Sequence, residues 1–320
     1  MNARVASLKR KVDPAALAAF GCIIVLLIAG SFYSTNFLSP DYLLQQLQVA
    51  SFLGLIATGM MLVILLGQID LSVPWTVTVG GMMSTGVTVF IPGGEPFAIP
   101  FGIACGMVFG LVNGIGVAYL RIPSMIFTLG VNAVAQGFMV IHTGGFAPQD
   151  YASDAMRFLS TARSVAGIPN ALWVWAAVGI ATVFLLNRTT YGRAVYGIGN
   201  RERAAYLSGI PTRRVVMIAF VISGGLSAFA GTLLAGYSTK AYQAMGDPYL
   251  LPAIAAVVLG GTNILGGRGT YLGTVAGVIL ITLLQSILSV MQMDEWGRQV
   301  IYGLVIIAML LLYGRERVSR

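Results

Sequence analysis

Long stretches without a formal charge constrain this chain more than any other feature of its sequence. Only 9% of the 320 residues are charged, and nine intervals of 20 or more residues hold no Asp, Glu, Lys or Arg. These intervals are 14–40, 42–69, 71–94, 96–120, 122–149, 164–187, 215–239, 248–267 and 269–293. About 20 apolar residues in a helix cross the hydrocarbon of a bilayer, and a tenth interval, 299–314, is long enough if its flanking arginines snorkel. We therefore predict ten membrane spans.

The apolar runs also indicate which secondary structure the spans adopt. In hydrocarbon each segment must satisfy its own backbone polar groups, which leaves helices and closed barrels. Barrel strands alternate in polarity over about 10 residues, whereas residues 23–28 and 304–312 are continuously apolar. We predict an all-α, polytopic membrane bundle of about ten transmembrane helices, in which residues 1–320 form a single domain. The run over 15–33 exceeds the apolar core of a signal peptide, so the first span is expected to stay uncleaved.

Lysine and arginine gather in three clusters that set the orientation of the chain. They lie at residues 4–11, 188–214 and 315–320. Short basic segments stay in the cytoplasm, and an even number of spans places all three clusters there. Together with Arg121 and Arg268, this orientation puts 15 of the 19 basic residues on the cytoplasmic side. We therefore predict that both termini, including residues 1–13, lie in the cytoplasm together with the 188–214 loop. The 143–170 loop is predicted to be external. The basic residues are dispersed around span ends, so we expect the lipid bilayer and no nucleic acid as a partner.

Glycine recurs at every fourth position in two of the predicted spans. The runs are Gly102, Gly106, Gly110 and Gly114, and then Gly273 and Gly277. Small residues four apart line one face of a helix and let a second backbone approach closely. This pattern predicts tight helix packing, with a pore-lining face as the alternative.

The first interruption of an apolar run falls at residues 67–75, where Asp70, Ser72 and Pro74 follow a very apolar segment. Proline cannot continue a helix without relief, which predicts a break here. Asp70 or Ser72 is expected to cap the helix that follows. Two interpretations stay open: a capped cytoplasmic turn, and a broken helix beside a translocation path.

The second interruption is rich in glycine. Residues 260–269 hold five glycines in ten positions, together with Thr262 and Asn263, and cannot keep a regular helix. Irregular backbone is tolerated at membrane depth only where protein or water covers it. A re-entrant segment near a translocation path and a tight cytoplasmic turn are both compatible with this pattern.

Two amides inside long apolar intervals, Asn113 and Asn132, complete the polar candidates. A polar side chain in hydrocarbon faces either a neighbouring helix or a cavity, and interhelical hydrogen bonding is the first expectation. We group both with Asp70, Ser72 and the second interruption as candidates for a translocation path. The only histidine, His142, lies at the outer end of its span and is expected to be an interfacial residue.

The predicted cytoplasmic loop contains a short helix with clear ends. Asn200 is a favoured N-cap, Glu202 suits the positive end of a helix, and Gly209 followed by Pro211 ends it. A helix of this length is marginal alone, so we expect it to be stabilised by docking on a partner. The candidate contact residues are Gly199, Asn200, Arg201, Glu202, Ala204, Ala205, Ser208 and Gly209.

The chain shows no nucleotide site of its own. A P-loop needs a Gly-Lys step, and Lys9, Lys11 and Lys240 follow other residues. One histidine cannot build a metal site or a catalytic triad with any partner that the sequence indicates. We therefore expect no catalytic residue, no cofactor and no metal in this chain.

At this point several segments resemble the ribose-type permease subunits of bacterial ABC sugar importers, the inner-membrane components of binding-protein-dependent transport systems. The likeness covers nearly the whole chain in order, with Val73-Pro74-Trp75 departing from the usual Val-Gly after the acid-Leu-Ser element. The segments are 69–72, 113–114, Pro123, 128–130, 192–193, 199–200, 204–205, 208–210, 254–262 and 266–269.

The resemblance implies a multi-pass protein of the bacterial inner membrane with three kinds of partner. They are a second permease subunit, identical or different, an ABC ATP-binding subunit that hydrolyses ATP, and a periplasmic sugar-binding protein. The helix over 200–208 would then be the coupling helix that contacts the ATP-binding subunit. The sugar, whether a pentose, a hexose or a polyol, is not readable from the residues.

The external loop over 143–170 carries two scarce cations, Arg157 and Arg163. They are candidates for docking the periplasmic binding protein, with a solvated surface as the alternative. A different class of function, an ion-coupled secondary transporter of a small polar solute, would need several buried ionisable residues, and here Asp70 is almost alone. A passive channel would leave the docked cytoplasmic helix without a purpose.

Overall fold

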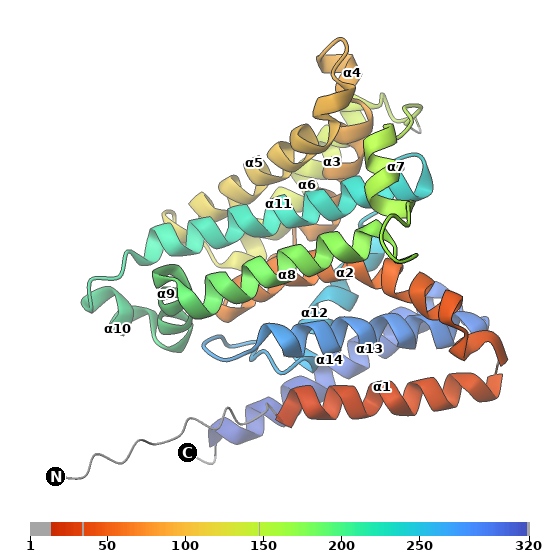
Figure 1. Cartoon of the computed structure of the whole chain (residues 1–320). Coiled ribbons are helices and arrows are strands. Elements are labelled where there is room, and N and C mark those ends of the chain that lie inside the picture. Colours follow the sequence, from red (N-terminus) through yellow and green to blue (C-terminus); the bar gives the residue numbers. More distant parts are fainter. Residues whose placement is uncertain (1–13, 34, 147, 319–320) are drawn as a thin grey trace.

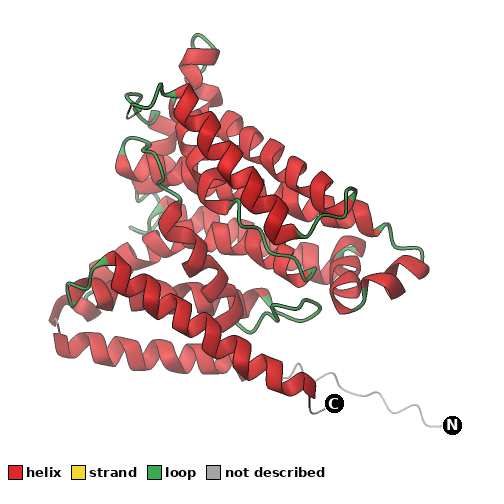
Figure 2. Cartoon of the chain, turned by 180° about the vertical axis from the view of Figure 1, so that it is seen from behind, coloured by secondary structure: helices red, strands yellow, loops and turns green. Residues whose placement is uncertain are grey.

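The computed structural model describes residues 14–33, 35–146 and 148–318 and is built of helices (Figure 1). Its described residues form no strand, and the view from behind shows helices joined by loops (Figure 2). The all-α fold class is therefore confirmed. The longer helices are α1 Pro14–Tyr33, α2 Pro40–Leu65, α3 Val73–Thr85, α5 Ala98–Ala118, α6 Ser124–His142, α8 Asn170–Arg188, α9 Thr190–Asn200, α11 Thr212–Ser238, α12 Leu250–Leu259, α13 Tyr271–Val290 and α14 Glu295–Val318. The shorter ones are η1 Thr35–Leu38, α4 Val87–Phe90, η2 Glu95–Phe97, α7 Asp154–Thr161, α10 Glu202–Leu207 and η3 Asp247–Tyr249.

Each of the ten uncharged intervals holds a helix, but the helices differ in length. Within the described part of the chain, six are long and apolar enough to cross a membrane. They are α2, α6, α8, α11, α13 and the stretch Glu95–Ala118 that contains α5. Six of the ten predicted intervals therefore hold a helix that is a candidate membrane span by length and composition.

Two of the remaining helices, α3 and α12, are too short to cross a bilayer alone. They have 13 and 10 residues, against about 20 for a span. Every residue of α3 is buried, and so are positions 252–258 of α12. Both short helices are therefore covered by other helices of the same chain, as irregular backbone at membrane depth requires.

Glycine sets the spacing between α5 and α11. A Cβ atom on Gly106 would lie 2.5 Å from the Gly224 carbonyl oxygen, and one on Gly110 would lie 2.3 Å from that of Phe220. The same holds between α13 and α12, where a Cβ on Gly277 would lie 1.9 Å from the Ala256 oxygen. The predicted tight packing is confirmed, because only a residue without a side chain lets these backbones approach.

The bundle has two ends, which we name after the short helices that mark them. At the α10 end lie α9, α10 and the start of α11, and at the α7 end lie α7 and the last turn of α11 (Figure 1). The start of α2 also lies at the α7 end, where Gln48 donates a hydrogen bond to the Ser160 carbonyl. A smaller apolar cluster, with Ile23 and Leu283, joins α1 to α13.

Candidate functional site

The break between α2 and α3 closes around a buried carboxylate. Asp70 is 1% exposed, and its Oδ1 accepts from the Ser72 amide at 3.0 Å and from the Ser72 hydroxyl at 2.6 Å. Its Oδ2 accepts from the Ser223 hydroxyl at 3.2 Å. The Asn113 amide donates to Ser72 Oγ at 2.7 Å. This polar cluster, Asp70, Ser72, Asn113 and Ser223, joins the start of α3 to α5 and α11.

The polar cluster lies inside the bundle and not at an exposed turn. Ser223 is 11 residues beyond Thr212, the first residue of α11, which places it about 16 Å along that helix. Ser72 precedes α3 but makes no side-chain capping bond, and the backbone amide that Asp70 accepts is that of Ser72, which lies before the first residue of α3. The expected cap is thus wrong, because both side chains turn toward the neighbouring helices.

One face of α6 supplies the hydrogen bonds that the broken backbone needs. Ser124 Oγ accepts from the Ile69 amide at 3.2 Å, Thr128 Oγ1 from the Leu71 amide at 2.9 Å, and Asn132 Oδ1 from the Trp75 amide at 3.3 Å. The three acceptors are four residues apart, so they line one face of the helix. The interhelical hydrogen bonding expected of Asn132 is confirmed. Ser124, Thr128 and Ser223 were not predicted as site residues, although the four-residue spacing on α6 is visible in the sequence.

The glycine-rich segment, residues 260–270, packs on the ends of α2 and α9. The Gly267 amide donates to the Leu65 carbonyl at 2.9 Å, and the Tyr196 hydroxyl donates to the Gly269 carbonyl at 2.9 Å. Gly266 and Gly267 have φ angles of 88° and 78°, which favour glycine. Thr262 is fully buried, while Asn263 closes the segment by accepting from the Leu265 amide at 2.9 Å.

The two interruptions therefore meet in space. A Cβ atom on Gly67 would lie 3.1 Å from the Leu265 carbonyl oxygen. Asp70, Ser72 and Asn113 share one cluster, with Asn132 beside it, and Thr262 and Asn263 lie in the glycine-rich segment. The six candidates thus form two groups, one in or beside the polar cluster and the other in the glycine-rich segment.

The short helix of the 188–214 loop is α10, and its start differs from the prediction. Asn200 is the last residue of α9, and Arg201 occupies the N-cap position without a side-chain bond. Asn200 as N-cap is therefore wrong, because Asn200 is still part of the preceding helix α9, which the sequence did not predict. Gly209 ends the segment with a φ of 82°, as predicted.

One face of α10 is buried and the other is exposed. Ala205 is buried against the same chain, whereas Tyr206 and Leu207 are 66% and 78% exposed. Glu202 pairs with Arg121 of the α5–α6 connection at 2.5 Å. At six residues α10 cannot be stable alone, so the Ala205 contact and this ion pair fix it to the bundle.

Gly199 of α9 packs against both the end of α2 and the glycine-rich segment, and its substitution gives a testable prediction. A Cβ atom there would lie 1.8 Å from the Leu65 oxygen and 2.5 Å from the Gly267 amide, whereas one on Gly197 meets only Ile210 Cδ1 at 3.7 Å. We expect Gly199→Ala to lower the stability of the purified chain by about 1–3 kcal/mol. Gly197→Ala should leave it unchanged or raise it, because alanine favours a helix. Thermal unfolding in detergent measures both, and equal midpoints would contradict this packing.

The candidate docking arginines lie at the α7 end and are half-exposed. Arg157 pairs with Asp154, and Arg163 Nη1 lies 3.5 Å from Asp41 Oδ1. Within this loop α7 packs on α11, where Met156 lies against Gly236. His142, expected at the interface, stacks on Phe90 with ring centroids 5.3 Å apart.

Comparison with known proteins identifies the family. A family model described as "Branched-chain amino acid transport system / permease component" matches residues 42–310. The chain is 35% identical to the ribose import permease protein RbsC of Bacillus subtilis over 297 residues, covering 92% of each chain. It is 31% identical to that of Haemophilus influenzae, covering 91% of each. It is also 31% identical to the autoinducer 2 import system permease protein LsrC of Salmonella typhi, covering 95% of this chain and 86% of the relative.

No solved structure matches the chain at a significant level. The family match spans most of the sequence, and the named relatives are permeases that align with it almost from end to end. The six long apolar helices agree with a multi-pass protein of the inner membrane. The protein therefore belongs to this family of permease components of bacterial import systems.

Proposed function

We propose that this chain is the membrane-spanning permease subunit of an ATP-driven importer of a small carbohydrate. The sugar, a pentose, a hexose or a polyol, is delivered by a periplasmic binding protein, and a separate subunit hydrolyses ATP. The observation that carries the proposal is the similarity, over more than nine-tenths of the chain, to permeases named for ribose import.

The exposed face of α10 is the proposed contact for the ATP-binding subunit. Tyr206 and Leu207 are large apolar side chains exposed at a predicted cytoplasmic end, and such residues anchor protein interfaces. Of the residues proposed from the sequence, Ala204 and Ser208 share this exposed surface, whereas Ala205 faces inward. Ala205 is thus better placed to hold α10 than to touch the partner.

A displacement of α10 has a direct route to the two interruptions. Gly199 and Asn200 lie between α10 and the glycine-rich segment, and Gly267 hydrogen-bonds the last turn of α2. We propose that closure of the ATP-binding subunits moves α10, and that the movement shifts the short helices α3 and α12 between outward and inward arrangements. On this proposal Asp70, Ser72, Asn113 and Asn132 hold α3, and Thr262 and Asn263 hold α12, at the border of the translocation path.

The proposed assembly has two permease chains, identical or different, with both termini and the α10 end in the cytoplasm. The ten proposed crossings of the membrane include α3 and α12, each of which crosses inside the bundle together with the segments that flank it. The α7 end faces the periplasm, where Arg157 and Arg163 are half-exposed and available to the binding protein.

A second substrate class comes from the family description, which names branched-chain amino acids. A thermal-shift screen of the cognate binding protein separates the two classes. We expect stabilisation by one member of a panel of pentoses, hexoses and polyols and none by leucine, isoleucine or valine. Stabilisation by an amino acid alone would overturn the carbohydrate assignment.

A further inference from the structure

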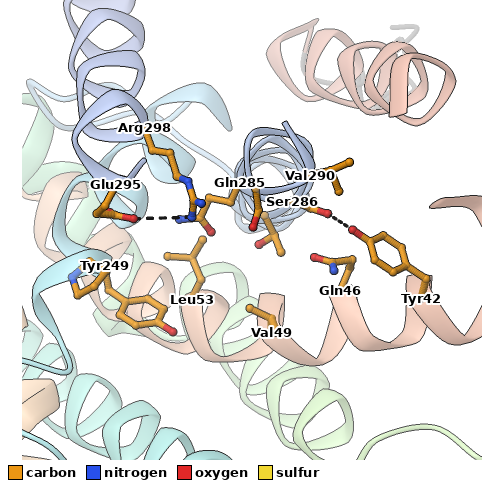
Figure 3. A pocket seen from close by; sticks show the side chains of 13 residues that line it. Tyr42, Gln46, Val49, Leu53, Tyr249, Gln285, Ser286, Val290, Glu295 and Arg298 are labelled. Carbon is orange, nitrogen blue, oxygen red and sulfur yellow. Dashed lines mark hydrogen bonds and ion pairs between the residues drawn. The ribbon is translucent and has the colours of Figure 1, made fainter. Parts of the chain in front are cut away.

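A polar cavity of about 390 Å³ lies at the α7 end, between α2, η3, α13 and the start of α14 (Figure 3). Thirteen residues line it, and nine of them carry a polar group, which is unusual in a chain with 57% hydrophobic residues. Its size falls in the range of sites for small ligands, about 300–1,000 Å³. The family comparisons assign nothing to this cavity.

Two polar helix faces oppose each other across the cavity. On α13, Thr282, Gln285, Ser286 and Ser289 follow the spacing of one helix face. Tyr42 and Gln46 of α2 are one turn apart, and Figure 3 shows Tyr42 joined to Ser286, with Gln46 close to the same serine. A polar face on a membrane helix meets a partner helix or a water-filled space. Here Tyr42 and Ser286 hydrogen-bond directly at one side, and the rest of the two faces is separated by the cavity.

The lining indicates the kind of ligand. Amide and hydroxyl groups each donate and accept hydrogen bonds, as the hydroxyls of a sugar do. The only charges are Glu295 and Arg298, whose charged atoms lie 3.7 Å apart, so the lining has no net charge. An anion would need an excess of donors and a cation an excess of acceptors. The Gln46 amide has no hydrogen-bond partner among the described residues and points into the cavity.

We propose that this cavity is the entry site for the transported solute, a neutral polyhydroxylated molecule, after its release from the binding protein. The proposal rests on the proposed function, which places the α7 end in the periplasm. Gln46 and Ser289 contact the solute, and the polar face of α13 guides it toward the middle of the bundle.

The test uses the complete transporter in proteoliposomes, with ATP, saturating binding protein and D-ribose, D-xylose, D-glucose or glycerol as solute. Gln46→Leu and Ser289→Leu remove polar groups that make no bond within the described chain. We expect each to lower the maximal uptake rate about tenfold, or about 1.4 kcal/mol, with ATP hydrolysis within twofold of wild type. Gln45→Leu is the matched control, because Gln45 is exposed at the preceding position of α2 and does not line the cavity.

The possible results distinguish failure of the entry site from failure of the proposed function. Uptake by Gln46→Leu and Ser289→Leu at the rate of Gln45→Leu would overturn the entry site and leave the proposed function standing. Failure of both variants to co-purify with their partners would assign this surface to subunit contact and overturn the site as well. Absence of ATP-driven uptake of all four solutes by the wild type would overturn the proposed function, and the entry site with it.

Discussion

Leu207→Glu is expected to lower ATP-driven uptake by at least about thirtyfold. Leu207 is 78% exposed at the predicted cytoplasmic end, and the proposal buries it in the interface with the ATP-binding subunit. An apolar interface anchor is worth about 2 kcal/mol or more, and a charge in its place adds a desolvation cost. Uptake and co-purification of the two subunits measure the effect.

Leu207→Met is the matched control, because it keeps the apolar volume and should retain most of the uptake. The bundle itself should be unaffected in either variant, since Leu207 makes little contact with its own chain. Equal uptake by the glutamate and methionine variants would show that α10 does not contact the ATP-binding subunit through this residue. Loss of the fold in both would be equally contrary to the exposed position of Leu207.

Asp70→Ala is expected to abolish uptake and to destabilise the chain by about 3 kcal/mol or more. The substitution removes the acceptor for the Ser72 amide, the Ser72 hydroxyl and the Ser223 hydroxyl, all of which are buried. A buried donor without a partner costs about 1–3 kcal/mol, and here three are left. Thermal unfolding in detergent and uptake by the complete transporter measure the two effects.

Asp70→Asn separates the shape of the polar cluster from its charge. The asparagine oxygen can accept both Ser72 bonds, and its amide can donate to Ser223 Oγ. If Asp70 holds α3 in place, this variant should keep at least about half of the wild-type uptake, since such networks depend on satisfied partners. Complete loss of uptake in a chain that unfolds at the wild-type temperature would indicate that the carboxylate itself carries a coupling ion.

The sequence was sufficient for the features that depend on patterns along one helix. Uncharged intervals predicted the positions of helices, and glycines four apart predicted a closely packed face on α5, although not that α11 packs there, because both follow from the periodicity of a helix. The breaks after Leu66 and at Gly260 were also predicted, since proline and glycine act on the local backbone.

Contacts between distant segments were beyond the reach of the sequence. Ser223 is 153 positions from Asp70, and nothing near either residue indicates that their side chains meet. The inward direction of Ala205 depends on how α10 lies on the bundle, and the helix α9, which the sequence did not predict, includes Asn200 as its last residue and so displaces the expected N-cap by one position. The contact between Gly67 and the glycine-rich segment could not be predicted either, because it depends on tertiary packing.

The most direct test of the central claim compares energy sources in one preparation of proteoliposomes. The vesicles contain the complete transporter and are given the sugar that stabilises the binding protein, with either ATP or a proton or sodium gradient. The account predicts uptake with ATP that requires the ATP-binding subunit and the binding protein, and no uptake by this chain alone under either gradient. Gradient-driven uptake by the chain alone, without ATP, would contradict the account and indicate an ion-coupled secondary transporter.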